Sequence, residues 1–209
     1  MRRFFLCILL LSVVGCSSQT NISNQFAQII YNIDLSNHED DLFHVTVYTS
    51  NLTKENYTYN FAATAPGTYQ KMDFGRYVKT FKAFDIDGNE LATNKISMNK
   101  WEIENVFSLA ELRYDIEDTF DSEIRKNNPY AMSGSGIDEN FVVLNTFAVL
   151  GYFEGLQSYP SKLKLDYKSD WTLGTALQKS DDGYYYTETY DQLADSPILM
   201  GDLSTAFTH

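Results

Sequence analysis

The sequence predicts an all-β fold, either an antiparallel β-sandwich or two packed antiparallel sheets with minimal helix. From Phe26 onward, apolar and polar residues alternate with a period of two, and no apolar stripe with the period of a helix persists over a helix length. Tyr and Phe, which favour the pleated surface of a sheet, raise the aromatic content to 15%. Turn-forming dipeptides separate the alternating runs, namely Pro66-Gly67, Asp87-Gly88 and Asp182-Gly183.

The residues before this pattern predict an export signal. Arg2 and Arg3 form a positive n-region, and residues 4–14 form an apolar run too short to span the roughly 30 Å core of a bilayer comfortably. The run ends in Val-Val-Gly-Cys, residues 13–16, which resembles the bacterial lipobox. We therefore expect a lipoprotein signal peptide over residues 1–15, cleavage between Gly15 and Cys16, and lipidation of Cys16. A plain signal peptide with an incidental cysteine is the alternative.

Lipidation would anchor the protein to a membrane without a membrane-spanning segment. We expect a polar tether over residues 16–25 and a location in the bacterial cell envelope, at the outer membrane and facing the periplasm. Cys7 and Cys16 are the two cysteines of the sequence, so the remainder has no thiol for a disulfide or a Cys-based zinc site. The formal net charge of -12 excludes nucleic acid as an expected partner, because binding it needs clustered Lys and Arg.

The β domain is expected over residues 26–201, followed by a tail over residues 202–209 at a truncated domain boundary. Strands are expected, in order, over residues 26–34, 42–50, 57–63, 78–86, 90–97, 101–107, 111–117, 141–153, 162–167, 171–176 and 184–189. Residues 121–140 contain many turn formers and few apolar residues, which predicts a long loop. Residues 190–196 are compatible with one helical turn that stops before Pro197.

One segment satisfies two patterns. Residues 108–111, Ser-Leu-Ala-Glu, fit the capping box that begins a helix. Leu112, Tyr114 and Ile116 alternate with charged residues, however, and a strand gathers such side chains on one face whereas a helix scatters them. We therefore expect a strand.

Two stretches resemble metal sites without meeting their requirements. His38 and His44 are six positions apart, whereas a zinc-peptidase helix needs His at i and i+4 with Glu between them. We expect a solvated turn and a strand histidine. Residues 85–90, Asp-Ile-Asp-Gly-Asn-Glu, resemble a calcium loop, but Gly88 stands fourth where an EF-hand needs its glycine sixth. We expect a hairpin turn there, and no metal ligand in this chain.

Two further stretches are candidates for functional sites. Residues 133–136, Ser-Gly-Ser-Gly, lack the pattern and the histidine partner of a hydrolase nucleophile, so a flexible loop is expected. Tyr184 and Tyr186, together with Trp171, are candidates for an aromatic platform that binds sugar or peptide. Strand alternation places Tyr184 and Tyr186 on one face and Tyr185 on the other, so part of this group is expected in the core.

Several fragments, taken in order, resemble the N-terminal domain of the bacterial glycyl aminopeptidases, metallopeptidase family sixty-one. They are residues 31–35, 42–47, 65–69, 83–91, 100–101, 153–155, 170–171 and 195–198. Together they cover nearly all of the expected β domain. The resemblance implies a β-rich domain that precedes a thermolysin-like zinc domain and often a PDZ domain. The family's zinc ligands lie in a helical HExxH segment beyond the position of Asp195 to Ile198, and this sequence contains no such segment.

We therefore expect a lipid-anchored, non-catalytic domain with a structural or substrate-cleft role in a zinc aminopeptidase. We expect no catalytic residue and no cofactor in this chain, since the zinc would belong to the missing domain, where zinc-bound water attacks a peptide carbonyl with Glu as base. The expected partners are that catalytic domain, a peptide substrate and the membrane. The alternative is a stand-alone cell-envelope lipoprotein that binds peptide or glycan through a sheet face. A hydrolase that uses carboxylates is the weakest hypothesis, since nothing in the sequence selects a pair.

Overall fold

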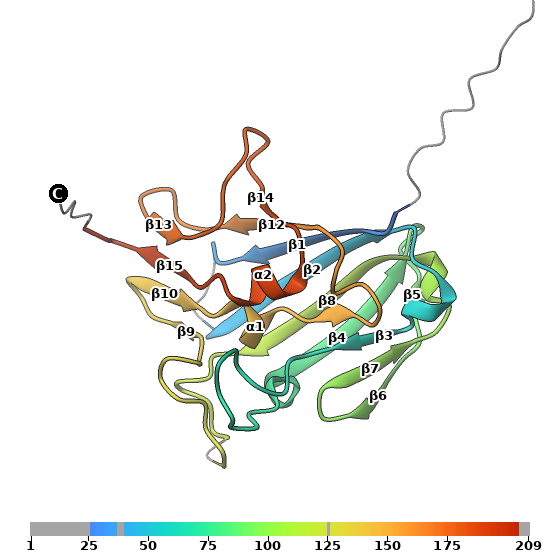
Figure 1. Ribbon diagram of the computed structural model, residues 1–209, viewed down its shortest axis with the longest axis horizontal. Helices are drawn as coiled ribbons and strands as arrows, with labels where there is room; N and C mark the ends of the chain where they lie inside the picture. The colour runs from blue at the N-terminus through green and yellow to red at the C-terminus, as the bar shows by residue number, and fades with distance from the viewer. Residues whose placement is uncertain (1–25, 37–39, 125, 205–209) are drawn as a thin grey trace, which may run out of the picture.

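The computed structural model describes residues 26–36, 40–124 and 126–204. The predicted signal peptide and tether, with Gly15 and Cys16, lie outside the described residues, as do His38 and the end of the predicted tail. In the part of the chain that is described, no helix is long and apolar enough to cross a bilayer. The fold is all-β with packed sheets, which confirms the predicted class (Figure 1).

A large sheet of seven strands forms one layer. Its order is β14 (Tyr185–Thr187), β12 (Ser161–Asp166), β1 (Gln28–Asp34), β2 (Leu42–Ser50), β8 (Leu109–Glu117), β4 (Val78–Asp85) and β5 (Glu90–Leu91). All neighbours in it are antiparallel except β1 and β12, which pair in parallel. The expectation of antiparallel pairing throughout was therefore wrong at this pair, because alternation reports which face a side chain takes and not the direction of the strand.

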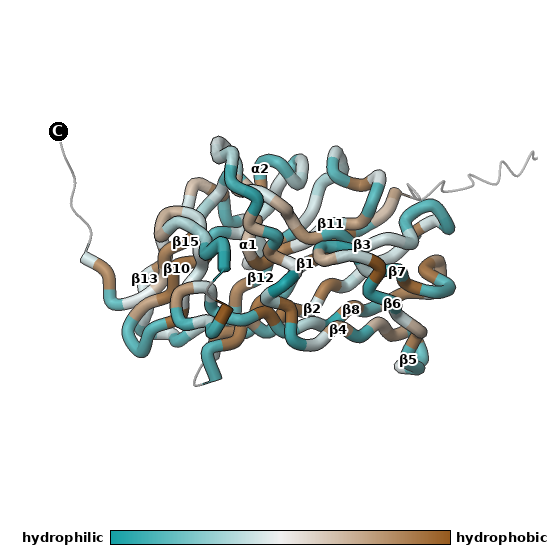
Figure 2. The backbone as a smooth tube through the Cα atoms, turned by 90° about the horizontal axis from the view of Figure 1, so that it is seen from below, coloured by the Kyte–Doolittle hydropathy of each residue, from teal (hydrophilic) through white to brown (hydrophobic). Residues whose placement is uncertain are grey.

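Two four-stranded sheets lie against the large sheet. One has the order β11 (Tyr152–Phe153), β3 (Thr58–Asn60), β7 (Lys100–Ile103) and β6 (Thr93–Ser97). The other has the order β13 (Thr172–Thr175), β15 (Ile198–Gly201), β10 (Phe141–Leu144) and β9 (Gly136–Ile137). Figure 2 shows β3, β7 and β11 in one layer above β2, β8 and β4 of the large sheet.

Short helical segments connect the strands. They are the 3-10 turns η1 (Lys54–Asn56), η2 (Phe74–Tyr77) and η3 (Val106–Ser108), and the helices α1 (Thr146–Val149) and α2 (Tyr190–Ala194). The helix α2 occurs where one turn before Pro197 was predicted, and Thr189 caps it by accepting a hydrogen bond from the backbone of Gln192. The segment 108–111 does not begin a helix: η3 ends at Ser108, and β8 begins at Leu109 and buries Leu112, Tyr114 and Ile116 on one face, as alternation predicted.

Aromatic rings fill the space between the large sheet and the β11-β3-β7-β6 sheet. Phe61 lies edge-on to Tyr114 of β8 and to Trp101 of β7, with ring centroids 5.1 and 5.2 Å apart. Phe81 of β4 stacks on Trp101 at 5.0 Å. Such ring pairs stabilise the core beyond the apolar area that they bury. The high Tyr and Phe content of the sequence therefore supplies the packing between these two sheets.

The predicted strand over residues 141–153 is interrupted. It ends at Leu144, turns through α1, and resumes as β11. The carbonyl groups at the end of α1 and just after it accept hydrogen bonds from three buried tyrosine hydroxyls, Tyr114 to Val149, Tyr190 to Leu150 and Tyr31 to Gly151. Alternation does not reveal the break because both strands and the turn between them are apolar.

Three other expectations need correction. The predicted strand over 101–107 ends at Ile103, and η3 follows. The predicted strand over 90–97 is divided between β5 of the large sheet and β6 of a small one. No strand was predicted over residues 198–201, but they form β15, which pairs with β13 on one side and β10 on the other.

The Ser-Gly-Ser-Gly stretch is buried rather than a flexible loop. Ser135 exchanges hydrogen bonds with Thr119 and Asn145, and Ser133 is also buried. The ring of Phe120 lies so close to Gly136 that a Cβ atom there would approach it to 2.2 Å. The stretch is therefore glycine-rich because a ring packs directly on its backbone.

Candidate functional site

The turn dipeptides lie where they were predicted and shape the surface. Gly67, Gly88 and Gly183 all have positive φ. Asp85 accepts hydrogen bonds from the backbone of Asp87 and from the backbone and side chain of Asn89. The bonds from Asn89 lower the pKa of Asp85. Residues 85–90 therefore form the expected hairpin turn. The Asp85 carboxylate is bound by groups of the turn itself, which differs from a calcium loop.

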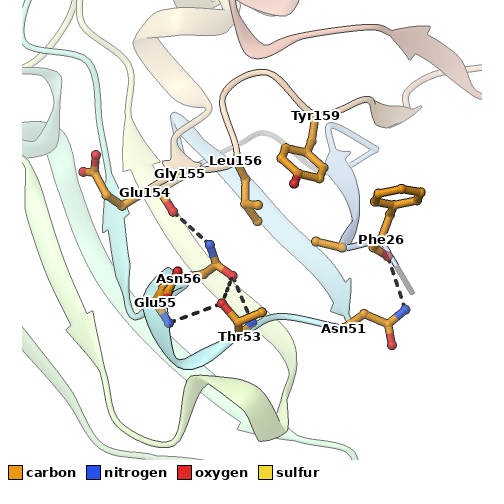
Figure 3. Close-up of a pocket in the computed structure, with 10 residues that line it drawn as sticks. Phe26, Asn51, Thr53, Glu55, Asn56, Glu154, Gly155, Leu156 and Tyr159 are labelled. Carbon is orange, nitrogen blue, oxygen red and sulfur yellow. Dashed lines mark hydrogen bonds between the residues drawn. The ribbon is translucent and has the colours of Figure 1, made fainter. Parts of the chain in front are cut away.

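A polar hollow lies where η1 meets the turn after β11. Its volume is about 350 Å³. Thr53 and Asn56 form a reciprocal cap, and the side-chain amide of Asn56 donates to the carbonyl of Glu154 at 3.0 Å. Figure 3 shows these polar groups on one side of the hollow and the rings of Phe26 and Tyr159 on the other. Thr53, Asn56 and the carbonyl of Glu154 thus bond to one another, and the carboxylate residues Glu55 and Glu154 complete the lining beside the two rings.

A second hollow, of about 470 Å³, lies between the Pro66-Gly67 turn and α2. Phe147 and Tyr190 line it, together with the carboxylates Asp191 and Asp195 one helical turn apart. Such a surface suits a cationic group that carries an apolar neighbour. The sequence offered no signal for this hollow, because the three segments that form it are far apart in the chain.

The predicted aromatic residues occupy two places. Tyr185 is buried whereas Tyr186 is 41% exposed, so the alternation of faces along this stretch is confirmed. The ammonium of Lys162 lies 5.1 Å from the ring centroid of Tyr184 and 4.8 Å from that of Tyr186. Trp171, by contrast, precedes β13 of a different sheet and lies under the ammonium of Lys168 at 4.9 Å.

The carboxylate of Asp182 contacts both Tyr186 and Lys162 and fixes their positions. The hydroxyl of Tyr186 donates to Asp182 at 2.8 Å, and Lys162 lies 3.4 Å from the same carboxylate. Hydrogen bonds from Ser180 and then from Tyr186 lower the pKa of Asp182, which keeps the carboxylate ionised. The predicted pair Tyr184 and Tyr186 is thus brought together around Lys162, on the exposed side of β14.

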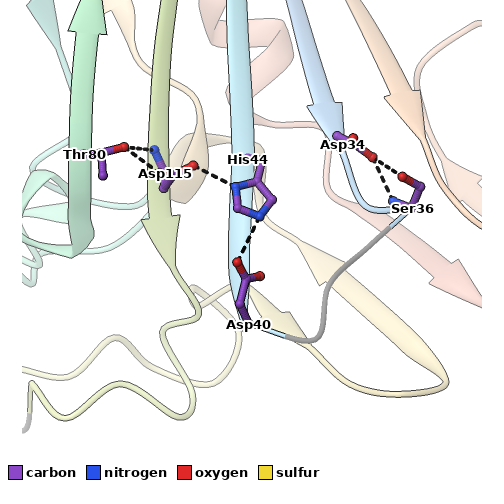
Figure 4. A network of polar contacts seen from close by, with 6 residues as sticks. All are labelled: Asp34, Ser36, Asp40, His44, Thr80 and Asp115. Atoms are coloured by element: carbon purple, nitrogen blue, oxygen red, sulfur yellow. Dashed lines mark hydrogen bonds and ion pairs between the residues drawn. The ribbon is translucent and has the colours of Figure 1, made fainter.

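His44 lies on β2, where a strand histidine was expected, and it contacts two carboxylates (Figure 4). Its Nδ1 is 2.7 Å from Asp115 and its Nε2 is 3.2 Å from Asp40. Burial lowers the pKa of His44, but the hydrogen bond with Asp115 and the charges of Asp40 and Asp115 outweigh it and raise the pKa. The two carboxylates face opposite ring nitrogens and do not converge on one point.

Among the described residues, no group of three or more His, Cys, Asp or Glu side chains is arranged to hold a metal ion. The side chains of this part of the chain therefore do not fit a zinc centre, and no step of a metal-assisted hydrolysis is assigned to them.

Comparisons with known proteins agree with this architecture. The family model of the peptidase M61 N-terminal domain matches residues 30–202. The crystal structure of an aminopeptidase N family protein from Idiomarina loihiensis is similar in fold, with a TM-score of 0.73 and 22% sequence identity. The match covers 85% of this chain and 30% of that one, so this chain spans less than a third of that protein. No curated protein matches the sequence.

The family match extends over most of the chain and includes all fifteen strands except the first two residues of β1. The chain belongs to the peptidase M61 N-terminal domain family.

Proposed function

We propose that this chain is the lipid-anchored, non-catalytic N-terminal domain of a glycyl-aminopeptidase-like zinc metallopeptidase. The family match over residues 30–202 carries the proposal. The similarity to a much longer aminopeptidase N family protein supports it, since there too a domain of this fold is part of a larger chain. Anchoring through Cys16 would hold the enzyme in the cell envelope, at the outer membrane and facing the periplasm.

In the complete enzyme, this domain forms one wall of the substrate cleft. The hollow between the Pro66-Gly67 turn and α2 supports this role, because its carboxylates Asp191 and Asp195 suit the cationic amino terminus of a peptide. The zinc and its ligands belong to the domain that follows.

The coding region after His209 provides the test. An in-frame HExxH segment is expected there, and the longer protein is expected to release N-terminal glycine from peptides in a zinc-dependent manner. Replacing the Glu of that segment with Gln is the matched control and abolishes release, whereas residues 1–209 alone release none. A stop codon directly after His209, or glycine release by residues 1–209, contradicts the proposal.

A second function is favoured by one observation. Tyr48 and Tyr186, on β2 and β14, are 45% and 41% exposed, on the side of the large sheet opposite the buried Val47 and Tyr185. A stand-alone envelope lipoprotein would use such a face to bind peptide or glycan. A stop codon directly after His209 favours this candidate over the first.

A further inference from the structure

The outward side of the seven-stranded sheet, here called the open face, carries side chains in ordered rows. Strand pairing places one row directly across the strands: Tyr186, Lys162, Ile30, Tyr48, Glu111 and Phe84. The row extends over five strand spacings, roughly 24 Å. It therefore has the length of an extended polymer of several units.

A second row, of polar side chains, lies beside the first. It consists of Lys164, Asn32, Thr46, Arg113 and Lys82. The Oδ1 atom of Asn32, in this row, is enclosed and has no hydrogen-bond partner among the described residues. Because this oxygen is closed off from the surface, a ligand that lies along the first row meets the other polar side chains of the second row and not Asn32 Oδ1.

The open face also has a hollow at one end of the first row. Its volume is about 300 Å³, and its lining includes Phe26, Ile30, Pro160 and Tyr186. Phe26 is 62% exposed. A ligand that lies along the row can thus place an apolar surface between two rings at this end.

The cations of the open face are already neutralised. Lys162 pairs with Asp182, Lys164 with Asp166, Arg113 with Glu111 and Lys82 with Glu90, at N–O distances of 2.5 to 3.8 Å. In a chain of net charge -12, such a face does not attract a polyanion. The same pairs also occupy their four carboxylates, so these rows offer no unpaired charge for a polycation either, and the ligand that fits is uncharged.

A peptide backbone also fits poorly. Peptides that bind sheets usually add a strand to an edge, where backbone groups are free. Here the backbone groups are used in the ladders between strands, and only side chains point outward. Exposed tyrosine rings and polar side chains in parallel rows suit a molecule with both flat apolar faces and hydroxyl groups.

We infer that the open face binds an uncharged, extended oligosaccharide, which stacks on Tyr48 and Tyr186 and places its hydroxyl groups along the polar second row. This inference rests on the second proposed function for the use of a sheet face, and it names the ligand class. Oligosaccharide binding by the open face does not require the peptidase domain, so it is compatible with the first proposed function in the same protein.

The test is titration of the full chain, in detergent, with neutral hexasaccharides of β-1,4-linked glucose, N-acetylglucosamine and xylose and of α-1,4-linked glucose. At least one is expected to bind, with an affinity that changes little when salt is raised. Tyr48→Ala and Tyr186→Ala are each expected to weaken that binding about tenfold or more, about 1.4 kcal/mol. Tyr48→Phe, which keeps the ring, is expected to retain most of it.

Tyr57→Ala is the matched control, because Tyr57 is 48% exposed, close to the 45% of Tyr48, but lies beside η1 and outside the large sheet. Thermal unfolding of each variant shows whether it is folded. An uncharged hexapeptide of Ala, Ser and Gly and an anionic hexagalacturonate are titrated in parallel.

The outcomes separate the inference from the function on which it rests. Binding of the hexapeptide alone, lost in Tyr48→Ala, overturns the oligosaccharide and leaves the sheet-face function standing. Salt-sensitive binding of hexagalacturonate alone overturns the uncharged ligand. Oligosaccharide binding that Tyr57→Ala weakens as much as Tyr48→Ala overturns the location. Binding of none of the probes overturns both the inference and the second function.

Discussion

The hydroxyl of Tyr31, in the middle of β1, donates a hydrogen bond of 2.8 Å to the carbonyl of Gly151, which lies 120 positions later in the chain. Both groups are buried, and Tyr31 is 2% exposed. Burial raises the pKa of the Tyr31 hydroxyl, so it remains a donor at any physiological pH. This bond fixes the segment after α1 over the large sheet.

Replacing Tyr31 with Phe tests the importance of that bond. The ring remains and the hydroxyl is lost, which leaves the buried carbonyl of Gly151 without this donor. We expect Tyr31→Phe to lower the free energy of unfolding by about 1–3 kcal/mol. Urea unfolding followed by circular dichroism measures it. Tyr48→Phe is the control, since Tyr48 is 45% exposed, and an equal loss in both variants would contradict this account.

The contact of Phe120 with Gly136 gives a second prediction. A Cβ at Gly136 would lie 2.2 Å from the Phe120 ring, so Gly136→Ala forces the ring or the strand to move. We expect Gly136→Ala to destabilise the protein by about 1–3 kcal/mol. Its midpoint of thermal unfolding should fall accordingly.

Gly174 provides the matched control. It also lies in the β13-β15-β10-β9 sheet, and a Cβ there would meet nothing within 4 Å. Gly174→Ala should therefore leave the midpoint nearly unchanged. Phe120→Ala should restore part of the stability lost in Gly136→Ala, and the absence of any such rescue would show that the ring is not the obstacle.

The sequence predicted local features well and tertiary packing poorly. The hairpin turns at Gly88 and Gly183, the strand over 109–117 and the face taken by Tyr186 follow from turn chemistry and alternation, which act between neighbours in the chain. The break between β10 and β11 depends on tyrosines from three distant elements, and the burial of Gly136 depends on Phe120. Such features are set by packing across the fold.

The same limit applies to the candidate sites. Tyr184 and Tyr186 were found because two positions along one strand share a face. Tyr48 was missed, although it lies in the same row, because its place depends on the register of β1 and β2. No pattern within a single strand encodes the pairing of Tyr48 with Ile30 or of Ile30 with Lys162.

Lipid anchoring makes a prediction for Cys16. Cells that express the full chain with a radiolabelled fatty acid should incorporate the label into the protein, because the thiol of Cys16 is the predicted acceptor. Cys16→Ala should lose the label and leave the membrane fraction. Cys7→Ala should keep both, since Cys7 is expected to leave with the signal peptide. Labelling that persists in Cys16→Ala would rule out this residue as the anchor.

The pair of carboxylates around His44 predicts how stability depends on pH. The pKa of His44 is raised above 6.5 in the folded protein, so folding favours the protonated ring. The stabilising contribution is therefore complete below about pH 6.5 and is lost as the pH rises through the higher pKa of the folded state. Because the ring is 35% exposed, we expect only a modest loss of stability above neutral pH.

Titration of the His44 ring protons by NMR tests this directly. In the wild-type chain the midpoint should lie above 6.5. Asp115→Asn removes the nearer carboxylate, at 2.7 Å, and should lower the midpoint more than Asp40→Asn does at 3.2 Å. His44→Asn should remove this part of the pH dependence of unfolding. A midpoint below 6.5 would mean that burial outweighs the two carboxylates at this strand position, and one that Asp115→Asn does not change would mean that Asp115 does not raise the pKa of His44.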